Sequence, residues 1–307
     1  MEKHNFTNKE GSIITYYKWG KNDNPKAIIQ IVHGMSEWVG RYDYFANKLV
    51  SEGYIVYGHD HSGHGNSAKS VNDLGYISDN NIFYTMLEDI KTLNDIIRNE
   101  NRDVPVILFG HSMGSFLSQR YLEEYGNTID ALILSGSNGR PKSFTKLGLL
   151  VCRNEMLIKG KGNRSKLMDK LSFGGFNSSV KNPDTDFDWL CGNLDEVNKY
   201  IEDEFCGFIY PTEFYYDLIN GLWDIHKNEN LEKVKKLNIP IFIFAGDRDP
   251  VGYLGKGIIN LYNTYKKIGV KDLEYKLYKD GRHEMLNEDN KDEVISDLLS
   301  WLKKHKF

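Results

Sequence analysis

One segment, VPVILFGHSMG (104–114), constrains the fold of this chain more than any other. The uninterrupted apolar run Val104–Phe109 leads directly into the pentapeptide GHSMG (110–114), and a helical pattern follows from about Met113 to Tyr125. A continuous apolar run is typical of a strand that is buried on both faces of a parallel sheet. So tight a strand-to-helix turn strains its central residue and leaves room only for glycine on either side. The segment therefore predicts that the Ser112 hydroxyl projects above the sheet.

The same alternation of short apolar runs and helical patterns recurs along the chain. It predicts strands at Ser12–Trp19, Ala27–Val32, Tyr54–Tyr57, Val104–Phe109, Ala131–Leu134, Pro240–Ala245 and Leu273–Tyr278. It predicts helices at about Tyr42–Ser51, Ile82–Ile97, Met113–Tyr125, Gly257–Ile268 and Val294–Leu302. We expect the first two strands, which the turn-rich KNDNP separates, to form a hairpin. The alternation as a whole predicts an α/β fold with a mostly parallel central sheet and helices on both faces.

The alternation breaks between Asn138 and about His226, where Gly, Phe and Trp are scattered without a strong strand signal. A chain of 307 residues suits one core domain of about 200 residues with an insertion. We therefore expect residues 1–137 and 227–307 to form the core, and residues 138–226 to form an inserted helical lid.

A serine hydroxyl becomes a nucleophile only when a base takes its proton, and that base needs a carboxylate to orient it. In this architecture the three residues follow the chain order serine, acid, histidine. His283 follows the last predicted strand, LEYKLY, and two aspartates, Asp247 and Asp249, follow the strand PIFIFA. The spacing leaves both aspartates open as the acid, and it favours Asp249 because Pro250 makes the chain after it rigid.

Acyl transfer also needs two N–H donors aimed at the oxygen of the tetrahedral intermediate. The residue after the serine supplies one donor, the backbone N–H of Met113, where the helix dipole also favours negative charge. The second donor is expected in the loop after an early strand. The strand IIQIV leads into HGMSE (33–37), in which the small Gly34 lets the backbone approach a substrate closely. The sequence predicts the Met35 N–H as this second donor.

Five segments, taken in order, resemble the α/β-hydrolase superfamily: HGMSE, GHDHSGHGNS, GHSMG, AGDRDPVG and GRHEM. More narrowly, the chain is similar to the monoacylglycerol lipase and lysophospholipase family, which are hydrolases of the serine aminopeptidase S33 type. The similarity covers nearly the whole chain and includes LSFGGFN (171–177) and DFDWLCGNLDEVNKY (186–200) of the expected lid. The resemblance implies an α/β-hydrolase fold and no cofactor. It also implies a nucleophile, its two partners and two backbone oxyanion donors, which are Ser112, Asp249, His283, Met35 and Met113.

The resemblance also decides between the two aspartates, because the acid of the family lies in a G-x-x-D-P-V segment, and this position is Asp249. The chain departs from the family at Trp38, where many members have histidine. The departure leaves the catalytic assignment unchanged and leaves recognition of the alcohol group near this loop open.

The expected lid is rich in Phe, Tyr, Trp and Leu, and more than half of these side chains must pack merely for the lid to fold. The remaining aromatic residues favour an apolar tunnel over a polar sugar site. Each acyl methylene buried in such a tunnel contributes about 0.8 kcal/mol. We therefore expect the lid to set the preferred acyl-chain length, and the substrate to be a small lipophilic ester, either a monoacylglycerol or a lysophospholipid.

Two alternatives stay open. An aminopeptidase or thioesterase would use the same triad, and an aminopeptidase would need an acidic anchor for a free N-terminus, for which the expected lid offers Glu202, Asp203, Glu204 and Glu213. A non-catalytic binding protein with the same fold is the second alternative, and the intact triad argues against it.

The segment GHDHSGHGN (58–66) raises a separate question, because His59, His61 and His64 have the H-x-H-x-x-H spacing of zinc hydrolases. A zinc site of that kind would have an acidic residue just before the third histidine, and this chain has Gly63 there. The segment instead matches the structural turn of the family beneath the oxyanion loop. We expect its imidazoles to be ordinary hydrogen-bonding groups, and we expect no metal.

Composition excludes further classes. The net charge is −4, from 39 basic and 43 acidic residues without a basic block or stripe, so a nucleic-acid partner is not expected. The three cysteines, Cys152, Cys191 and Cys206, are widely spaced and predict reduced thiols. The N-terminal segment lacks the apolar region of a signal peptide, and no run of about 18 apolar residues occurs. We expect a cytoplasmic protein whose lid makes at most transient contact with membrane surfaces.

Overall fold

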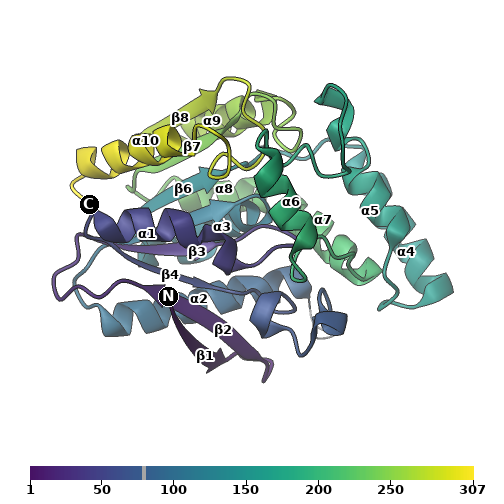
Figure 1. Ribbon diagram of the computed structural model, residues 1–307, viewed down its shortest axis with the longest axis horizontal. Helices are drawn as coiled ribbons and strands as arrows, with labels where there is room; N and C mark the ends of the chain where they lie inside the picture. Colours follow the sequence, from purple (N-terminus) through teal and green to yellow (C-terminus); the bar gives the residue numbers. More distant parts are fainter. Residues whose placement is uncertain (78–80) are drawn as a thin grey trace.

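An eight-stranded sheet forms the centre of the computed structural model, which describes residues 1–77 and 81–307 (Figure 1). The strand order is β1-β2-β4-β3-β5-β6-β7-β8. β2 pairs antiparallel with both β1 and β4, and all other neighbouring strands are parallel. The strands are β1 Glu2–Thr7, β2 Ile13–Trp19, β3 Ile28–Val32, β4 Ile55–His59, β5 Val106–His111, β6 Ala131–Ser135, β7 Ile241–Gly246 and β8 Leu273–Tyr278.

Helices cover both faces of the sheet, which confirms the predicted fold class (Figure 1). On one face α1 and α10 pack against strand residues such as Phe109, and on the other face α2, α3, α8 and α9 pack against residues such as Leu108. Phe109 and Leu108 are neighbours in β5, so they point to opposite faces, and both are fully buried. The α-helices are α1 Asp43–Ser51, α2 Ile82–Glu100, α3 Met113–Tyr125, α4 Thr145–Lys159, α5 Lys166–Phe173, α6 Leu194–Glu202, α7 Thr212–Ile225, α8 Asn228–Val234, α9 Lys256–Ile268 and α10 Lys291–Lys304. The 3₁₀ helices are η1 Val39–Tyr42, η2 Gly65–Ser67, η3 Val71–Asp73, η4 Gly126–Thr128 and η5 Phe176–Ser179. Within the part of the chain that the structure describes, every helix is too short or too polar to cross a bilayer.

The predicted hairpin between the first two predicted strands is wrong. β2 and β3 are not neighbours, because β4 lies between them. β2 instead forms a hairpin with β1, which the sequence patterns missed, through a turn in which the Asn8 N–H donates to the Ser12 carbonyl at 2.9 Å. The physical reason is burial: all five residues of β3 are buried, and such a continuous buried run is typical of a strand inside the parallel part of a sheet, where β3 has β4 and β5 as its parallel neighbours.

Between β6 and β7 the chain leaves the sheet and forms α4, α5, α6, α7 and α8, and the first four of these helices lie in the segment in which the sequence predicted helices. α7 packs against α2 and α3, and its Phe214 and Tyr215 belong to the main core. α4 packs on α7, and α4 and α5 extend beyond the sheet at the right of Figure 1.

The carboxyl ends of the parallel strands bring the predicted site residues to one edge of the sheet. β3 leads into the 33–37 loop, β5 into Ser112, β7 into the loop with Asp249, and β8 into the loop with His283. Ligands of open α/β sheets bind at this edge. The topology therefore places chain segments from four separate parts of the sequence around one site.

Candidate active site

Ser112 stands at the turn between β5 and α3, directly before the first residue of the helix. Its φ of 53° and ψ of −121° lie where residues other than glycine are rarely found, so the turn is strained. Its N–H donates to the Ser135 carbonyl at 2.9 Å, and its own carbonyl accepts from the Ser115 hydroxyl at 2.6 Å. The backbone is thus held from both sides while the side chain is only half-buried and lines a cavity.

Two glycines let the 33–37 loop and α3 come into contact. A Cβ atom on Gly114 would collide with the carbonyl oxygens of Val32 and His33. A Cβ atom on Gly34 would lie 3.2 Å from the Cβ of Ser112. The loop after β3 therefore passes directly beside the serine.

His283 and Asp249 form a buried pair in which Nδ1 of the imidazole lies 3.0 Å from Oδ1 of the carboxylate. The same Oδ1 accepts the Val251 N–H at 2.9 Å, which holds the carboxylate in position. Burial opposes a charged imidazolium, but the Asp249 carboxylate outweighs burial, so the pKa of His283 is raised above its ordinary value of 6.5. An imidazole whose Nδ1–H is held by a carboxylate presents Nε2 as a base.

The structure separates the two aspartates that spacing left open. Asp247 accepts the backbone N–H of Asp280 at 2.8 Å and lies 3.8 Å from Arg248. Asp247 is half-buried, whereas Asp249 is fully buried and is the one in contact with His283.

Ser112 and His283 line the same cavity. Among the described residues, the Ser112 hydroxyl makes no hydrogen bond. In enzymes without a bound substrate, the contact between nucleophile and base is often long, and it tightens when the substrate binds.

The N–H groups of the 33–37 loop have acceptors on either side of Met35. The Gly34 N–H donates to Glu37 Oε1 at 2.5 Å, and the Ser36 N–H donates to the Tyr210 hydroxyl at 2.7 Å. The Met35 N–H between them has no acceptor among residues 1–77 and 81–307, and Met35 lines the cavity. The Met113 N–H belongs to the first turn of α3, whose N–H groups have no partner within the helix. Neither of the two donors named from the sequence therefore has an acceptor among the described residues.

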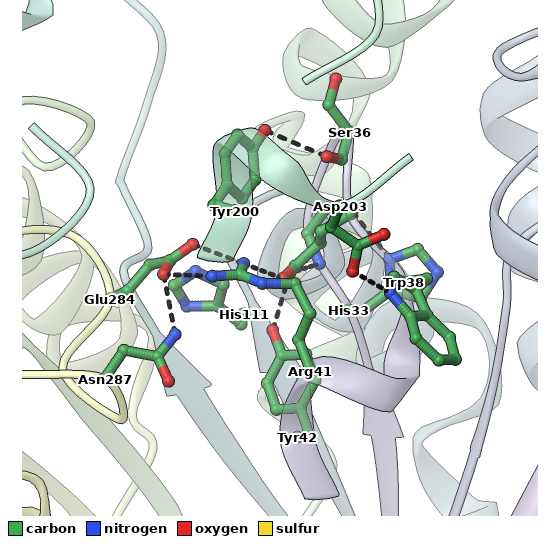
Figure 2. Close-up of polar contacts among 12 residues, drawn as sticks. His33, Ser36, Trp38, Arg41, Tyr42, His111, Tyr200, Asp203, Glu284 and Asn287 are labelled. Atoms are coloured by element: carbon green, nitrogen blue, oxygen red, sulfur yellow. Dashed lines mark hydrogen bonds and ion pairs between the residues drawn. The ribbon is translucent and has the colours of Figure 1, made fainter. Parts of the chain in front are cut away.

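A buried ion-pair network centred on Arg41 lies beside this loop (Figure 2). The guanidinium donates to both carboxylate oxygens of Glu284 at 2.7 Å each and to Glu37 at 2.7 Å. It also lies over the ring of Tyr200, 4.8 Å from its centroid. Burial alone would raise the pKa of Glu284, but Arg41 outweighs burial and holds that pKa below its ordinary value of 4.5. Burial raises the pKa of Glu37, and the adjacent Glu284 adds to the effect despite Arg41. Two carboxyl groups share one guanidinium, so this region carries no excess positive charge.

The cavity has a volume of about 550 Å³ and a lining of apolar and polar side chains. Its apolar side chains are Met35, Phe173, Phe187, Trp189, Leu190, Phe208 and Ile209, and the segment between β6 and β7 also contributes the polar residues Asp169, Lys170, Asn177 and Asp186. Beside Ser112 and His283 its lining is polar and comes from Glu37, His111, Tyr200 and Glu284. The arrangement suits a ligand with an apolar chain and a compact polar end.

Trp38, the departure from the family pattern, does not belong to the described lining of the cavity. Its indole N–H donates to Asp203 at 2.8 Å (Figure 2). Its ring packs edge-on against Phe205, with a centroid distance of 5.5 Å. Trp38 therefore ties the loop to the residues after α6 and leaves the polar end of the cavity to other side chains.

Sequence reasoning missed four residues of this region: Arg41, Tyr200, Glu284 and Tyr210. Arg41 is four residues after Glu37, and Glu284 directly follows His283, so each had a signal in its position next to a motif. Tyr200 and Tyr210 had no such signal in the sequence, because a tyrosine in an aromatic segment is usually a packing residue.

The three histidines of GHDHSGHGN pack beside the start of the 33–37 loop: His61 and His64 pack against His33, and His59 packs against His61. The His61 N–H donates to Nε2 of His33 at 3.0 Å, and the Tyr210 hydroxyl lies 2.6 Å from Nε2 of His64. Both ring nitrogens of His59 are buried and have no partner among the described residues. Burial lowers the pKa of His59 to about 3 and of His64 to about 4. At neutral pH these imidazoles are therefore uncharged packing and hydrogen-bonding groups.

One group of potential metal ligands occurs in the part of the chain that the structure describes, formed by Asp272, Glu274 and His305. It lies near the surface, and Glu274 already accepts from the Trp301 indole at 3.1 Å and from the Lys304 ammonium at 2.8 Å. The group is a set of ordinary ion pairs outside the cavity that Ser112 lines.

Known proteins resemble the chain over most of its length. Residues 23–290 match the family described as serine aminopeptidase, S33. The chain is 25% identical over 304 residues to the monoacylglycerol lipase of Mycolicibacterium smegmatis, which covers 99% of this chain and 97% of that protein. It is 25% identical over 300 residues to the monoglyceride lipase of Mus musculus, covering 96% of this chain and 88% of that protein. The crystal structure of a thermostable carboxyl esterase from Bacillus coagulans in complex with glycerol matches with a TM-score of 0.91 at 31% identity, covering 100% of this chain and 99% of that chain.

Proposed function

The chain belongs to the serine aminopeptidase S33 family, and from that premise we propose that it is a carboxylic ester hydrolase that cleaves monoacylglycerols. The observation that carries the proposal is the buried His283–Asp249 pair, because its His283 lines, together with Ser112, a cavity that has many apolar side chains in its walls. The similarity to a monoacylglycerol lipase and to a carboxyl esterase supports the same reaction class.

In the proposed reaction the Ser112 hydroxyl attacks the ester carbonyl while Nε2 of His283 takes its proton. The tetrahedral oxyanion accepts hydrogen bonds from the Met35 and Met113 N–H groups. His283 then gives the proton to the leaving alcohol, and an acyl chain remains bound to Ser112. Water, activated by the same imidazole, releases the fatty acid. No step needs a cofactor.

We assign the acyl chain to the apolar part of the cavity. Its aromatic walls, which include Phe173, Phe187 and Trp189, come from the segment between β6 and β7. This supports residues 138–226 as a lid on a core formed by residues 1–137 and 227–307. Because each buried methylene contributes about 0.8 kcal/mol, this segment sets the preferred chain length.

We assign the leaving alcohol to the polar end beside Glu37, Tyr200 and Glu284. Hydroxyl groups of a polyol can donate to carboxylate oxygens there. Beside these carboxyl groups a phosphate would meet only Arg41, which is already paired with two of them; the other cation of the described lining is Lys170, which comes from α5. The polar end therefore favours a neutral glycerol group over the phosphate of a lysophospholipid, and the related carboxyl esterase is in complex with glycerol.

The surface of α4 and α5 supports contact with a lipid aggregate. Exposed apolar side chains gather there: Phe144, Leu147, Leu150, Leu157, Ile158, Leu167 and Leu171. The expectation that the chain has no basic block does not hold for residues 140–181. They carry two acidic residues, Glu155 and Asp169, and ten basic ones, which are Arg140, Lys142, Lys146, Arg153, Lys159, Lys161, Arg164, Lys166, Lys170 and Lys181. Exposed apolar groups surrounded by basic residues suit an anionic lipid surface.

The three free cysteines support a cytoplasmic location.

The acidic residues named for the aminopeptidase alternative do not support it, although two other aspartates, Asp169 and Asp186, line the cavity. Of its four candidate anchors, none belongs to the described lining of the cavity. Asp203 accepts the Trp38 indole N–H, and Glu213 pairs with Lys161 at 2.8 Å.

A substrate panel tests the proposal. Purified protein is assayed with monoacylglycerols of several chain lengths, lysophosphatidylcholine, p-nitrophenyl esters and aminoacyl p-nitroanilides, with Ser112→Ala as the control. We expect ester hydrolysis that prefers monoacylglycerols, is lost in Ser112→Ala, resists metal chelators and is blocked by a fluorophosphonate probe. Activity that survives in Ser112→Ala would contradict the assignment, and a preference for the p-nitroanilides would favour the aminopeptidase.

A further inference from the structure

Ser36, directly after Met35, adopts a φ of 54°, which is strained for a serine. The polar atoms of Ser36 all bind one short segment, residues 200–210. The Ser36 N–H donates to the Tyr210 hydroxyl at 2.7 Å, and the Ser36 hydroxyl donates to the Phe208 carbonyl at 3.0 Å. The Ser36 carbonyl accepts from the Tyr200 hydroxyl at 3.0 Å (Figure 2) and from the Gly207 N–H at 3.0 Å. The strained conformation is thus held by the last turn of α6 and by the segment that joins α6 to α7.

The hydrogen bond at Tyr210 has a defined direction. Because the Tyr210 hydroxyl accepts the Ser36 N–H, its own proton donates to Nε2 of His64 at 2.6 Å. His64 can accept this proton because its Nδ1–H donates to the Ser62 carbonyl at 2.9 Å, and burial keeps the ring neutral by lowering its pKa to about 4. The Tyr210 ring is fully buried and stacked on Phe214, with a centroid distance of 3.7 Å. The hydroxyl is therefore fixed both by packing and by its partner.

The Met35 N–H lies in the peptide plane between Gly34 and Met35. The plane before it is held by the Gly34 N–H on Glu37, and the plane after it is held by the Ser36 N–H on Tyr210. The carbonyl of the plane itself accepts from Nδ1 of His33 at 2.8 Å. Each anchor restricts the direction in which the Met35 N–H points.

We propose that Tyr210, supported by His64, is a positioning residue that aims the Met35 N–H at the oxyanion. The inference rests on the proposed ester hydrolysis. Tyr210 does not belong to the described lining of the cavity, so it acts through Ser36 and not through the substrate. The histidine of the GHGN segment, which resembled a metal ligand, serves here as the proton acceptor that orients Tyr210.

The expected effect follows from the cost of a misplaced donor. Removing one oxyanion donor costs about 10²–10³ in kcat, and displacing a group by about 1 Å costs about 10². Tyr210→Phe keeps the buried ring and removes only the acceptor of the Ser36 N–H. We expect kcat to fall about 10- to 100-fold while KM stays within about 2-fold, because the interaction is used in the transition state.

The test measures kcat and KM of Tyr210→Phe with a p-nitrophenyl ester and a monoacylglycerol. It also measures inhibition by a long-chain trifluoromethyl ketone, whose hemiketal oxyanion occupies the same position, and by the free fatty acid. Tyr121→Phe is the matched control. Tyr121 lies in α3 and belongs to the main core, it is fully buried, and its hydroxyl lies 2.7 Å from the Thr128 hydroxyl. We expect ketone affinity to fall with kcat/KM in Tyr210→Phe only, and fatty-acid affinity to be unchanged in both variants.

A double-mutant cycle tests the role of His64. His64→Leu is expected to lower kcat about 3- to 10-fold, and His64→Leu combined with Tyr210→Phe should be no slower than Tyr210→Phe alone, because both act through one hydroxyl. If Tyr210→Phe does not fold, His64→Leu carries the same comparison of kcat, KM and ketone affinity.

Several outcomes would overturn the inference. These are a wild-type kcat in folded Tyr210→Phe, a change confined to KM, or losses in His64→Leu and Tyr210→Phe that multiply in the double variant. Wild-type protein that neither hydrolyses esters nor binds the ketone would overturn the proposed function itself, and with it the inference.

Discussion

Replacing His59 by leucine is expected to stabilise the protein more in acid than at neutral pH. His59 is the last residue of β4 and is fully buried, and neither ring nitrogen has a partner among the described residues. Its ring lies among other rings, 4.9 Å from that of His61 and 6.4 Å from that of Phe6. Burial, with a smaller effect of His64, lowers the pKa of His59 from 6.5 to about 3.

The sign follows from proton binding. A histidine with a lowered pKa in the folded protein binds fewer protons there than in the unfolded chain at any pH below about 6.5. The wild-type protein therefore loses stability at this residue as the pH falls through 6.5 toward 3, and a variant without the imidazole does not. Between about pH 7.5 and pH 5 the difference in free energy of unfolding changes by about 2 kcal/mol, at 1.36 kcal/mol for each pH unit below the ordinary pKa.

Urea unfolding of wild type and His59→Leu, near both pH values and followed by tryptophan fluorescence and circular dichroism, measures this change. The packing cost of leucine enters equally at the two pH values and cancels in the comparison. Phe6→Leu is the control, since it alters the packing beside His59 without removing a titratable group. A stability difference for His59→Leu that is the same at both pH values would refute the reasoning.

Three further predictions concern the site and the surface. Asp249→Asn should lower kcat/KM by about 10⁴, because the imidazole loses its orienting carboxylate, whereas Asp247→Asn should remain within about 3-fold; equal losses would contradict the assignment of the acid. Because the nearby Glu284 carboxylate helps to raise the pKa of His283, Glu284→Gln should shift the acidic limb of the kcat/KM–pH profile to lower pH, and a shift to higher pH or none would count against it. Leu157→Glu with Ile158→Glu should weaken binding to vesicles that contain phosphatidylglycerol by at least about 10-fold, since each side chain contributes about 1.5–3 kcal/mol when buried in lipid. Hydrolysis of a water-soluble ester should be unchanged, and Leu254→Glu, at another exposed leucine, is the matched control.

The sequence by itself determined the features that rest on local rules. A buried strand, a glycine-flanked serine and a helix in direct succession predict the strained turn at Ser112, and the structure has that turn with a φ of 53°. The alternation of strands and helices predicts the architecture, in which the acid and the histidine follow the serine at the ends of later strands. The turn at Ser112 needs only neighbours along the chain, which is why a single sequence predicts it.

The tertiary structure decided the rest, because the contacts concerned join residues far apart in the chain. Arg41 meets Glu284 across 243 positions, and Tyr210 meets Ser36 across 174 and His64 across 146. No periodicity links such residues, and a charged or aromatic side chain has the same local pattern whether it faces solvent or an ion pair. The same holds for β2, which pairs with β1 and β4 and not with β3, the next strand along the chain after the KNDNP turn. In this protein the local sequence predicts the nucleophile and its helix, whereas long-range packing determines which groups surround them and how the backbone donors are aimed.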